Sequence, residues 1–93
     1  MKNEFSNKVR DVVRKIPKGT VMTYKQVAKK AGSPKAYRAV ATLMAHNYNK
    51  DVPCHRVIRT DGTLGGYNRG GIAAKEKMLR TEGVSFTREK VVL

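Results

Sequence analysis

The chain has 93 residues, and twenty Lys and Arg against seven Asp and Glu give it a formal net charge of +13 at pH 7. This length suits one small domain over residues 1–93 and not two. A single cysteine excludes an internal disulfide, and no apolar run is long enough for a signal peptide or a membrane span. We therefore expect a cytoplasmic monomer with no membrane partner, associated with the nucleoid if the source is prokaryotic.

The positive charge is concentrated in the first half of the chain. Residues 1–50 carry twelve basic and two acidic side chains, whereas residues 51–93 carry eight and five. Such a surplus suits a polyanion such as nucleic acid. A basic face could equally bind a membrane surface or RNA, or be merely solvated, so charge alone leaves the partner open.

Three helices are predicted in the first half. The first has an apolar stripe at helical spacing and ends at Pro17; its members are Phe5, Val9, Val12, Val13 and Ile16. Thr23 and Gln26 fit a capping box that opens a second helix, and Gly32 fits its C′ position. Ser33, followed by proline, reads as the N-cap of a third helix over residues 34–46. Two short helices separated by a tight turn make a helix-turn-helix.

The third predicted helix carries several small residues, which could face either a nucleic-acid groove or the preceding helix. Its predicted apolar face consists of Ala36, Ala39, Val40, Leu43 and Met44. Lys35 and Arg38 are left to project outward. The alanines allow close approach to nucleic acid or tight packing on the preceding helix, and composition does not separate these two uses.

The second half is predicted to hold a hairpin, a loop and a last helix. A polar loop at 47–51 leads to a hairpin over 57–64 with Asp-Gly at its turn. The glycine-rich stretch 65–71 lacks the spacing of a phosphate-binding loop. A last helix over 72–82 has Ile72, Met78 and Leu79 facing inward and Gly83 as C′. Residues 84–93 remain unassigned.

The only cysteine, Cys54, is followed directly by one of the two histidines, His55. A thiolate is a strong nucleophile, and His55 could take the thiol proton. Adjacent side chains of an extended strand point to opposite faces, so direct contact would need a turn or a bridging water. A free cysteine is also commonly a buried, inert hydrophobe. Two histidines without an acidic cluster predict no metal site.

The stretch Pro-Cys-His-Arg-Val-Ile at 53–58 resembles the active-site motif of the methylated-DNA–protein-cysteine methyltransferases, or O6-alkylguanine-DNA alkyltransferases. The flanking matches, from residue 5 to residue 83, are 19–28, 38–40, 61–67, Lys75, Leu79, Glu82 and Gly83. The resemblance implies the family's DNA-binding and active-site domain. That domain is mostly α, a small winged-helix-like helix-turn-helix domain with a short β-hairpin. The N-terminal domain found in many members is expected to be absent.

By this resemblance, the catalytic residues are Cys54, His55, Glu82 and Tyr24. Cys54 would accept the alkyl group from O6-alkylguanine, once and without a cofactor. His55 would take the thiol proton through a water, and Glu82 would orient His55. Glu82 lies near a helix C-terminus, where carboxylates are unfavourable, and such a partner would explain its placement. Tyr24 would hydrogen-bond the base and stabilise charge as guanine leaves.

The resemblance also assigns the partner, which is double-stranded DNA carrying O6-alkylguanine. The third helix would enter the minor groove, and Arg38 would fill the space left by the flipped nucleotide. The expected DNA-binding residues are Arg38, Tyr24, Lys35, Ser33, Ala36 and Ala39. In the substrate pocket, Asn47 would tie the helix to the active-site turn, and the Cys54 and Val57 carbonyls would accept the guanine amino group. Tyr67 would wall this pocket, and an N–H near Asn68 or Arg69 would donate to the guanine oxygen.

Two other functions remain open at this point. The first is a non-enzymatic lesion binder resembling the alkyltransferase-like proteins, against which Cys54 argues, because another residue replaces the reactive cysteine there. The second is a plain helix-turn-helix DNA-binding protein with an inert, buried Cys54. Its affinity would fall steeply with salt, with a slope of about −0.9 per phosphate contacted, and it would show no preference for damaged DNA.

Overall fold

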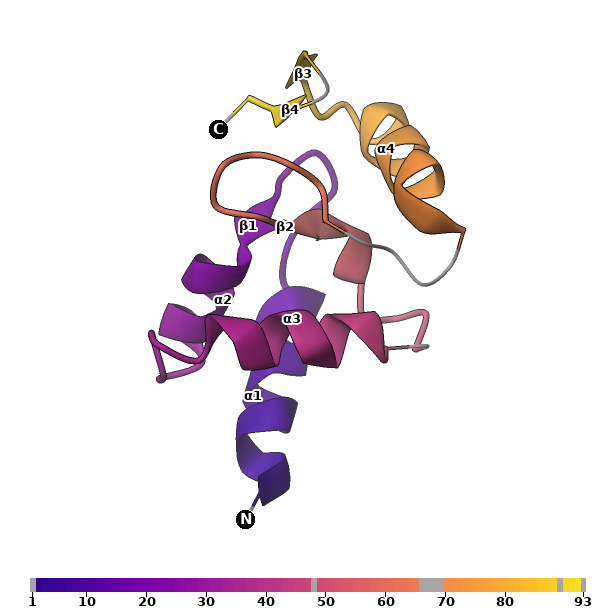
Figure 1. Ribbon diagram of the computed structural model, residues 1–93. Helices are drawn as coiled ribbons and strands as arrows, with labels where there is room; N and C mark the ends of the chain where they lie inside the picture. Colours follow the sequence, from indigo (N-terminus) through magenta and orange to yellow (C-terminus); the bar gives the residue numbers. More distant parts are fainter. Residues whose placement is uncertain (1, 48, 66–69, 89, 93) are drawn as a thin grey trace.

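The computed structural model describes residues 2–47, 49–65, 70–88 and 90–92, and they form a mostly helical domain (Figure 1). The helices are α1 (Lys2–Arg14), α2 (Tyr24–Lys30), α3 (Tyr37–Ala45) and α4 (Gly71–Thr81), with a 3₁₀ turn η1 (Cys54–Arg56). The strands are β1 (Met22–Thr23), β2 (Val57–Ile58), β3 (Phe86–Thr87) and β4 (Lys90–Val91). This architecture confirms the predicted small helix-turn-helix domain. No helix among the described residues is long and apolar enough to cross a membrane.

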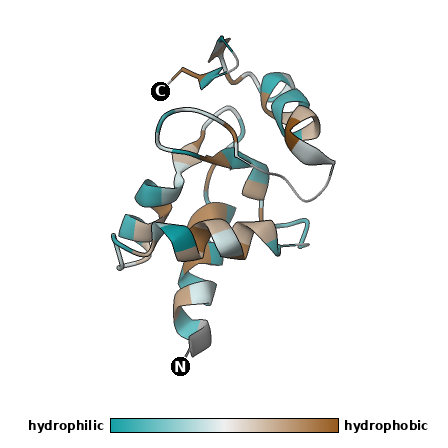
Figure 2. Cartoon of the chain, viewed as in Figure 1, coloured by the Kyte–Doolittle hydropathy of each residue, from teal (hydrophilic) through white to brown (hydrophobic). Residues whose placement is uncertain are grey.

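The first helix follows its predicted stripe. Val9 and Val13 are fully buried, Ile16 beyond the helix end is buried too, and Phe5 and Val12 are partly buried against the same core. Hydrophilic and hydrophobic residues alternate along the helices, as expected for elements that cover a core with one face (Figure 2).

The predicted helix ends around α2 and α4 are confirmed by their hydrogen bonds. The Gln26 N–H donates to Thr23 Oγ1 over 3.1 Å and the Thr23 N–H donates to Gln26 Oε1 over 2.8 Å, which is the capping box. Gly32 has a φ of +93°, and the next N–H donates back to the Ala28 carbonyl over 3.0 Å. Gly83 ends α4 in the same way.

The third helix begins three residues later than predicted. The Ala36 N–H donates to the Ser33 carbonyl over 2.9 Å, so residues 33–36 close a turn, and Ser33 is not the N-cap. The reason lies in Pro34, because its fixed φ suits the second position of a β-turn as well as the first position of a helix. The turn separates Ser33 from α3, which starts at Tyr37.

Three residues predicted to face inward are exposed instead. Ala39 on α3 is exposed, whereas Val40 and Met44 are buried as expected. On α4, Ile72 is 57% exposed and Met78 38%. The buried face of α4 is formed by Leu79 together with Lys75, so it is rotated from the stripe that apolar residues alone suggest.

The strands pair differently from the prediction. Strand β2 runs parallel to β1, with Met22 opposite Val57, and among the described residues no strand forms near Leu64. Just after β2, the Arg59 N–H donates to the Thr63 carbonyl over 2.9 Å. The predicted turn itself is present, because the Gly62 N–H donates to the Arg59 carbonyl over 3.0 Å. The short antiparallel hairpin is formed by β3 and β4, in the segment left unassigned.

The domain has two core clusters, and β2 lies at the seam between them. Val57 belongs to a cluster built mainly from the first three helices, and Ile58 belongs to a cluster with Leu64, Leu79, Val84 and Val91. Figure 1 shows the same division: the β3–β4 hairpin and α4 lie at the end opposite the N-terminus of α1. The residues just before β2 are therefore held from two sides.

The C-terminal hairpin is fixed to the turn at Gly62 by a close backbone approach. The Val91 N–H donates to the Gly62 carbonyl over 2.9 Å. Gly62 has a φ of +89°, and a Cβ there would lie 2.9 Å from the Val91 carbonyl oxygen. Only glycine meets both conditions without displacing the hairpin.

Replacing Gly62 with alanine should therefore cost more stability than the same change at Gly32. A Cβ at Gly32 has no neighbouring atom within 4 Å, so Gly32→Ala is destabilising only through its left-handed φ, by about 1 kcal/mol in the free energy of unfolding. Gly62→Ala adds the clash with Val91 and should cost at least about 2 kcal/mol in the free energy of unfolding, measured with denaturant. Equal losses in the two variants would contradict the close approach.

Candidate active site

The turn η1 places Cys54 and His55 side by side inside the domain. Both are buried, with 4% and 6% of their surfaces exposed. The Cys54 N–H donates to the Val52 carbonyl over 2.8 Å, and the Val57 N–H donates back to the Cys54 carbonyl. A 3₁₀ turn thus replaces the extended geometry that would direct neighbouring side chains to opposite faces.

The structure brings His55 and Glu82 together, as expected from the resemblance. His55 Nε2 and Glu82 Oε2 lie 2.9 Å apart, and the two side chains are 8% and 12% exposed. Glu82 is the C-cap of α4, 27 residues after His55. The carboxylate that is unfavourable at its own helix end is therefore matched by a partner from η1.

Arg56 joins the same carboxylate, which the sequence did not predict. Its Nε donates to Glu82 Oε1 over 2.9 Å and its Nη2 to Glu82 Oε2 over 2.8 Å. Its Nη1 donates to the Ile16 carbonyl over 2.7 Å. The sequence shows an arginine beside the histidine and a glutamate at a helix C-terminus, but no local pattern predicts that these two residues pair.

This network fixes the charge of Glu82 and the tautomer of His55. The bidentate contact with Arg56, helped by His55, lowers the pKa of Glu82 to about 2. The carboxylate is therefore ionised at neutral pH and only accepts hydrogen bonds. His55 Nε2 must then carry the hydrogen, which makes Nδ1 the proton-accepting nitrogen of the neutral ring.

Tyr24 and Lys75 complete the electrostatic surroundings of Cys54. Burial raises the pKa of Tyr24, the first residue of α2. The positive charge of Arg59 lowers this pKa, and a negative charge at Cys54 raises it further. Burial lowers the pKa of Lys75 to about 8. A negative charge at Cys54 raises this pKa, and the positive charge of Arg59 lowers it. Both groups are thus close enough to Cys54 for its charge to affect their titration.

Five of the six expected DNA-binding residues lie together on the turn before α3 and its first residues, whereas the sixth, Tyr24, is the half-buried first residue of α2. Arg38 is the second residue of α3, and it is exposed together with Ser33, Lys35 and Ala39; Ala36 is half-buried. The turn lines a shallow hollow of about 550 Å³. An exposed basic helix start suits contact with a polyanion.

The expected pocket residues are only partly described. Asn47 is buried, and its Nδ2 donates to the Val52 carbonyl over 3.2 Å, so it links the end of α3 to the segment entering Cys54. Val57 is fully buried, and its carbonyl accepts a hydrogen bond from Lys75 Nζ over 2.8 Å. The expectations for residues 67–69 lie outside the described residues.

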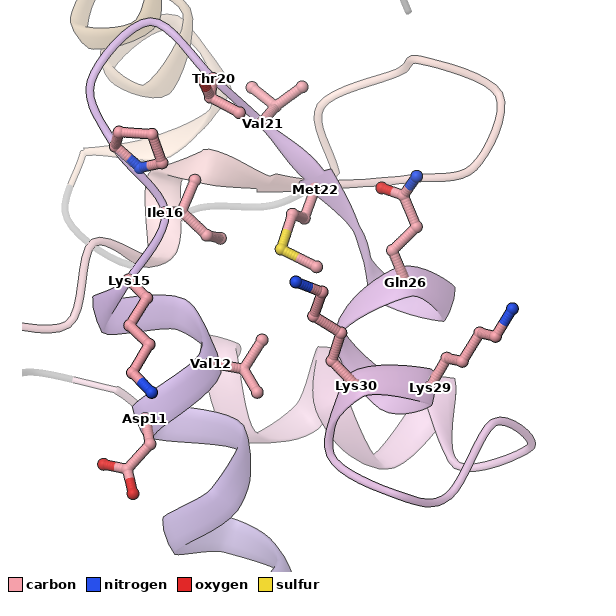
Figure 3. Close-up of a pocket in the computed structure, with 11 residues that line it drawn as sticks. Asp11, Val12, Lys15, Ile16, Thr20, Val21, Met22, Gln26, Lys29 and Lys30 are labelled. Atoms are coloured by element: carbon pink, nitrogen blue, oxygen red, sulfur yellow. The ribbon is translucent and has the colours of Figure 1, made fainter.

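Two hollows lie near these elements, and one of them adjoins the site. Tyr24 lines a cavity of about 370 Å³ whose other residues are Lys25, Tyr37, Arg59, Thr60 and Asp61. A groove of about 910 Å³ lies between α1 and α2, lined by Lys15 on one side and by Lys29 and Lys30 on the other (Figure 3). None of the predicted site residues that the structure describes lines it. Among the described residues no three His, Cys, Asp or Glu side chains gather to hold a metal.

Comparison with known proteins gives one consistent result. A family model described as "6-O-methylguanine DNA methyltransferase, DNA binding domain" matches residues 4–84. The methylated-DNA–protein-cysteine methyltransferase of Methanothermobacter thermautotrophicus is 46% identical over 84 residues, which are 89% of this chain and 46% of that protein. The bifunctional transcriptional activator/DNA repair enzyme Ada of Escherichia coli is 47% identical over 85 residues, or 90% of this chain and 24% of Ada. The chain thus spans about half the length of these relatives or less.

The solved structures that are similar to this chain include two bound to DNA. Mycobacterium tuberculosis OGT in complex with DNA has a TM-score of 0.79 at 40% identity, covering 85% of this chain and 48% of that one. Atl1 of S. pombe, in complex with damaged DNA containing O6-carboxymethylguanine, has a TM-score of 0.79 at 33% identity. The match covers 98% of this chain and 87% of Atl1.

The depressed pKa of Glu82 predicts how stability responds to acid. A carboxyl with a pKa of about 2 when folded and 4.5 otherwise stabilises the fold above pH 4.5, and this stabilisation is lost as the pH falls toward 2. The difference in unfolding free energy between wild type and Glu82→Gln should therefore shrink, by about 2–3 kcal/mol, from pH 6 to pH 2.

A matched control is Glu76→Gln, because Glu76 pairs with Arg80 on the surface at 2.8 Å. This change should alter stability by less than about 1 kcal/mol at every pH. A Glu82→Gln difference that stays constant from pH 6 to pH 2 would contradict the network.

Proposed function

This chain belongs to the 6-O-methylguanine DNA methyltransferase family, and from that membership we propose that it repairs O6-alkylguanine in double-stranded DNA. The alkyl group would pass directly to Cys54. The observation that carries this proposal is the buried Cys54 in a turn beside His55, whose ring is held by the ionised Glu82. A nucleophile, a base and a group that orients the base are thus supplied by one turn and one helix end.

The reaction follows from this arrangement. His55 Nδ1 takes the thiol proton of Cys54 through a water, and the thiolate sulfur attacks the alkyl carbon. The S–C bond forms as the C–O6 bond breaks, and the bonding electron pair moves into the guanine ring, which takes up a proton at N1 in exchange for the thiol proton and leaves as neutral guanine. The Tyr24 hydroxyl donates a hydrogen bond to the leaving base. The product is a thioether at Cys54, so each molecule acts once and needs no cofactor.

DNA binding would use the basic side of the helix-turn-helix. The O6 atom of a stacked guanine lies on the major-groove edge of its base pair, whereas α3 would enter the minor groove, so the nucleotide must rotate out before the buried Cys54 can reach it. The exposed Arg38 at the start of α3 would fill the vacated space from the minor groove. Lys35 and Ser33, on the exposed turn before α3, would contact the phosphate backbone.

A second candidate is lesion binding without transfer. The likeness to Atl1 favours it, because that match extends over nearly the whole of both chains. The presence of Cys54 in a complete site with His55 and Glu82 favours transfer. Both candidates share the flipped guanine and differ only in whether the sulfur is alkylated.

Intact-protein mass spectrometry distinguishes the two. The protein is incubated with duplex DNA carrying one O6-methylguanine, and it should gain one methyl mass, mapped to Cys54. The Cys54→Ala control should gain none and should still prefer the lesion in a binding assay. No gain in the wild type, with lesion preference retained, would support lesion binding alone. Loss of both would contradict both candidates.

Arg38 should matter for duplex DNA and not for the chemical step. Arg38→Ala is expected to slow transfer from duplex DNA at least about tenfold, because it removes the side chain that stabilises the open duplex. Its reaction with the free base O6-benzylguanine should be unchanged. Lys77→Ala removes one exposed charge elsewhere and serves as the control. If both variants slow transfer from duplex DNA equally, Arg38 contributes only its charge, and its role in filling the space of the flipped nucleotide is contradicted.

A further inference from the structure

We propose that the groove between α1 and α2 is a docking site for an acidic, partly apolar segment of a partner protein. This inference goes beyond the proposed function, because it concerns a surface that none of the described site residues lines. Success or failure of alkyl transfer therefore leaves it standing.

The floor of the groove is apolar and only partly covered. Ile16 is buried, Val12 and Met22 are half-buried, and Pro17 is exposed. Figure 3 shows the side chains of Val12, Ile16 and Met22 between the lysine-bearing walls. The volume of about 910 Å³ is large enough to hold several side chains of a ligand. Apolar surface left open in a hollow of this size is typical of a binding site.

The rim of the groove is positively charged. Lys15 lines it just after α1, and Lys29 and Lys30 line it from the last turn of α2. All three are exposed, and within the described part of the chain none of them forms an ion pair. Asp11, a carboxylate among the lining residues, is already bound to Arg14 at 2.8 Å. The rim therefore offers ammonium groups to the carboxylates of a ligand.

Floor and rim together select the kind of occupant. A nucleic-acid backbone would match the lysines but would leave the apolar floor unfilled, because phosphate and sugar carry no large apolar groups. A second copy of this chain would be repelled by its own charge of +13, and no two of its acidic residues lie closer than six positions apart. A peptide that carries carboxylates and apolar side chains matches both parts of the groove.

The groove adjoins the elements that hold the candidate site. Met22 lies opposite Val57 in the pairing of β1 with β2, and the Ile16 carbonyl accepts a hydrogen bond from Arg56 over 2.7 Å. Arg38, by contrast, is not among the residues that line the groove. We therefore expect the partner segment and DNA to bind the domain at the same time.

The role of the apolar floor is tested with a pair of synthetic peptides. The probe is a fluorescein-labelled helical peptide with leucine at every third or fourth position and glutamate at most others, and its binding to the full chain is measured by fluorescence anisotropy. The control peptide has serine in place of each leucine and keeps the charge. The leucine peptide should bind at least about tenfold tighter, because its apolar side chains leave water. Equal affinities would overturn the proposal.

The role of the rim is tested with matched charge reversals. The double variant Lys29→Glu/Lys30→Glu should bind the leucine peptide at least about tenfold more weakly than the wild type. The control Lys8→Glu/Lys77→Glu changes the net charge equally at two exposed positions outside the groove and should stay within about threefold. Circular dichroism confirms that both variants are folded. Equal weakening would show attraction by net charge alone and would overturn the proposal.

A measurement on the wild type maps the site without any substitution. In NMR spectra, the leucine peptide should shift the methyl resonances of Val12, Val21 and Met22, while the exposed Val92 stays unchanged. Undamaged duplex DNA added to this complex should leave the peptide bound. Shifts confined to α3, or release of the peptide by DNA, would assign its binding to the DNA-binding surface and overturn the separate docking site.

Discussion

The carboxylate of Glu82 is the point on which both the fold and the candidate site depend. It accepts two hydrogen bonds from Arg56 and one from His55, while Arg56 also reaches the Ile16 carbonyl just beyond α1. Three segments far apart in the chain are thereby tied together around one ionised group. Because its surroundings exclude most water, removing one partner leaves the remaining charges poorly compensated. The same contacts that stabilise the fold therefore set the orientation and tautomer of His55.

The two core clusters explain how the molecule keeps Cys54 fixed while it leaves the start of α3 exposed. Cys54 belongs to the cluster under the helix-turn-helix, and β2 continues from it into the cluster under α4. Asn47 links the end of α3 to the Val52 carbonyl, two residues before Cys54. Arg38, near the start of α3, is exposed. A buried sulfur and an exposed basic helix start thus belong to the same small domain, which under the proposed function suits a substrate that rotates from the surface to the interior.

Local signals predicted the parts of this structure that are determined locally. The Thr23 capping box, the glycines after α2 and α4 and the α1 stripe each depend on residues within a few positions. The His55–Glu82 contact was expected only because the motif resembles a known family. Parallel pairing of β2 with β1 and docking of the C-terminal hairpin depend on contacts between distant segments, which periodicity does not report. The burial of Lys75 was missed for a different reason: apolar patterns exclude a lysine from a buried face, although the Val57 and Leu64 carbonyl oxygens accept hydrogen bonds from it there.

Lys75 and Glu82 are seven residues apart, so they lie on the same face of α4 and its C-cap, two turns from each other. One helix face thus directs a cation toward the strand after Cys54 and an anion toward His55. Under the proposed mechanism, the thiol proton moves from Cys54 to His55 through a water, which leaves a thiolate and an imidazolium in a largely buried site. The imidazolium then lies against the Glu82 carboxylate, which was ionised and in place before the proton moved. Charges arranged in advance lower the cost of separating new ones, because nothing has to reorient at that moment. The C-cap of α4 would thus supply the fixed charge of the site, and the turn at Cys54 would supply the reacting groups.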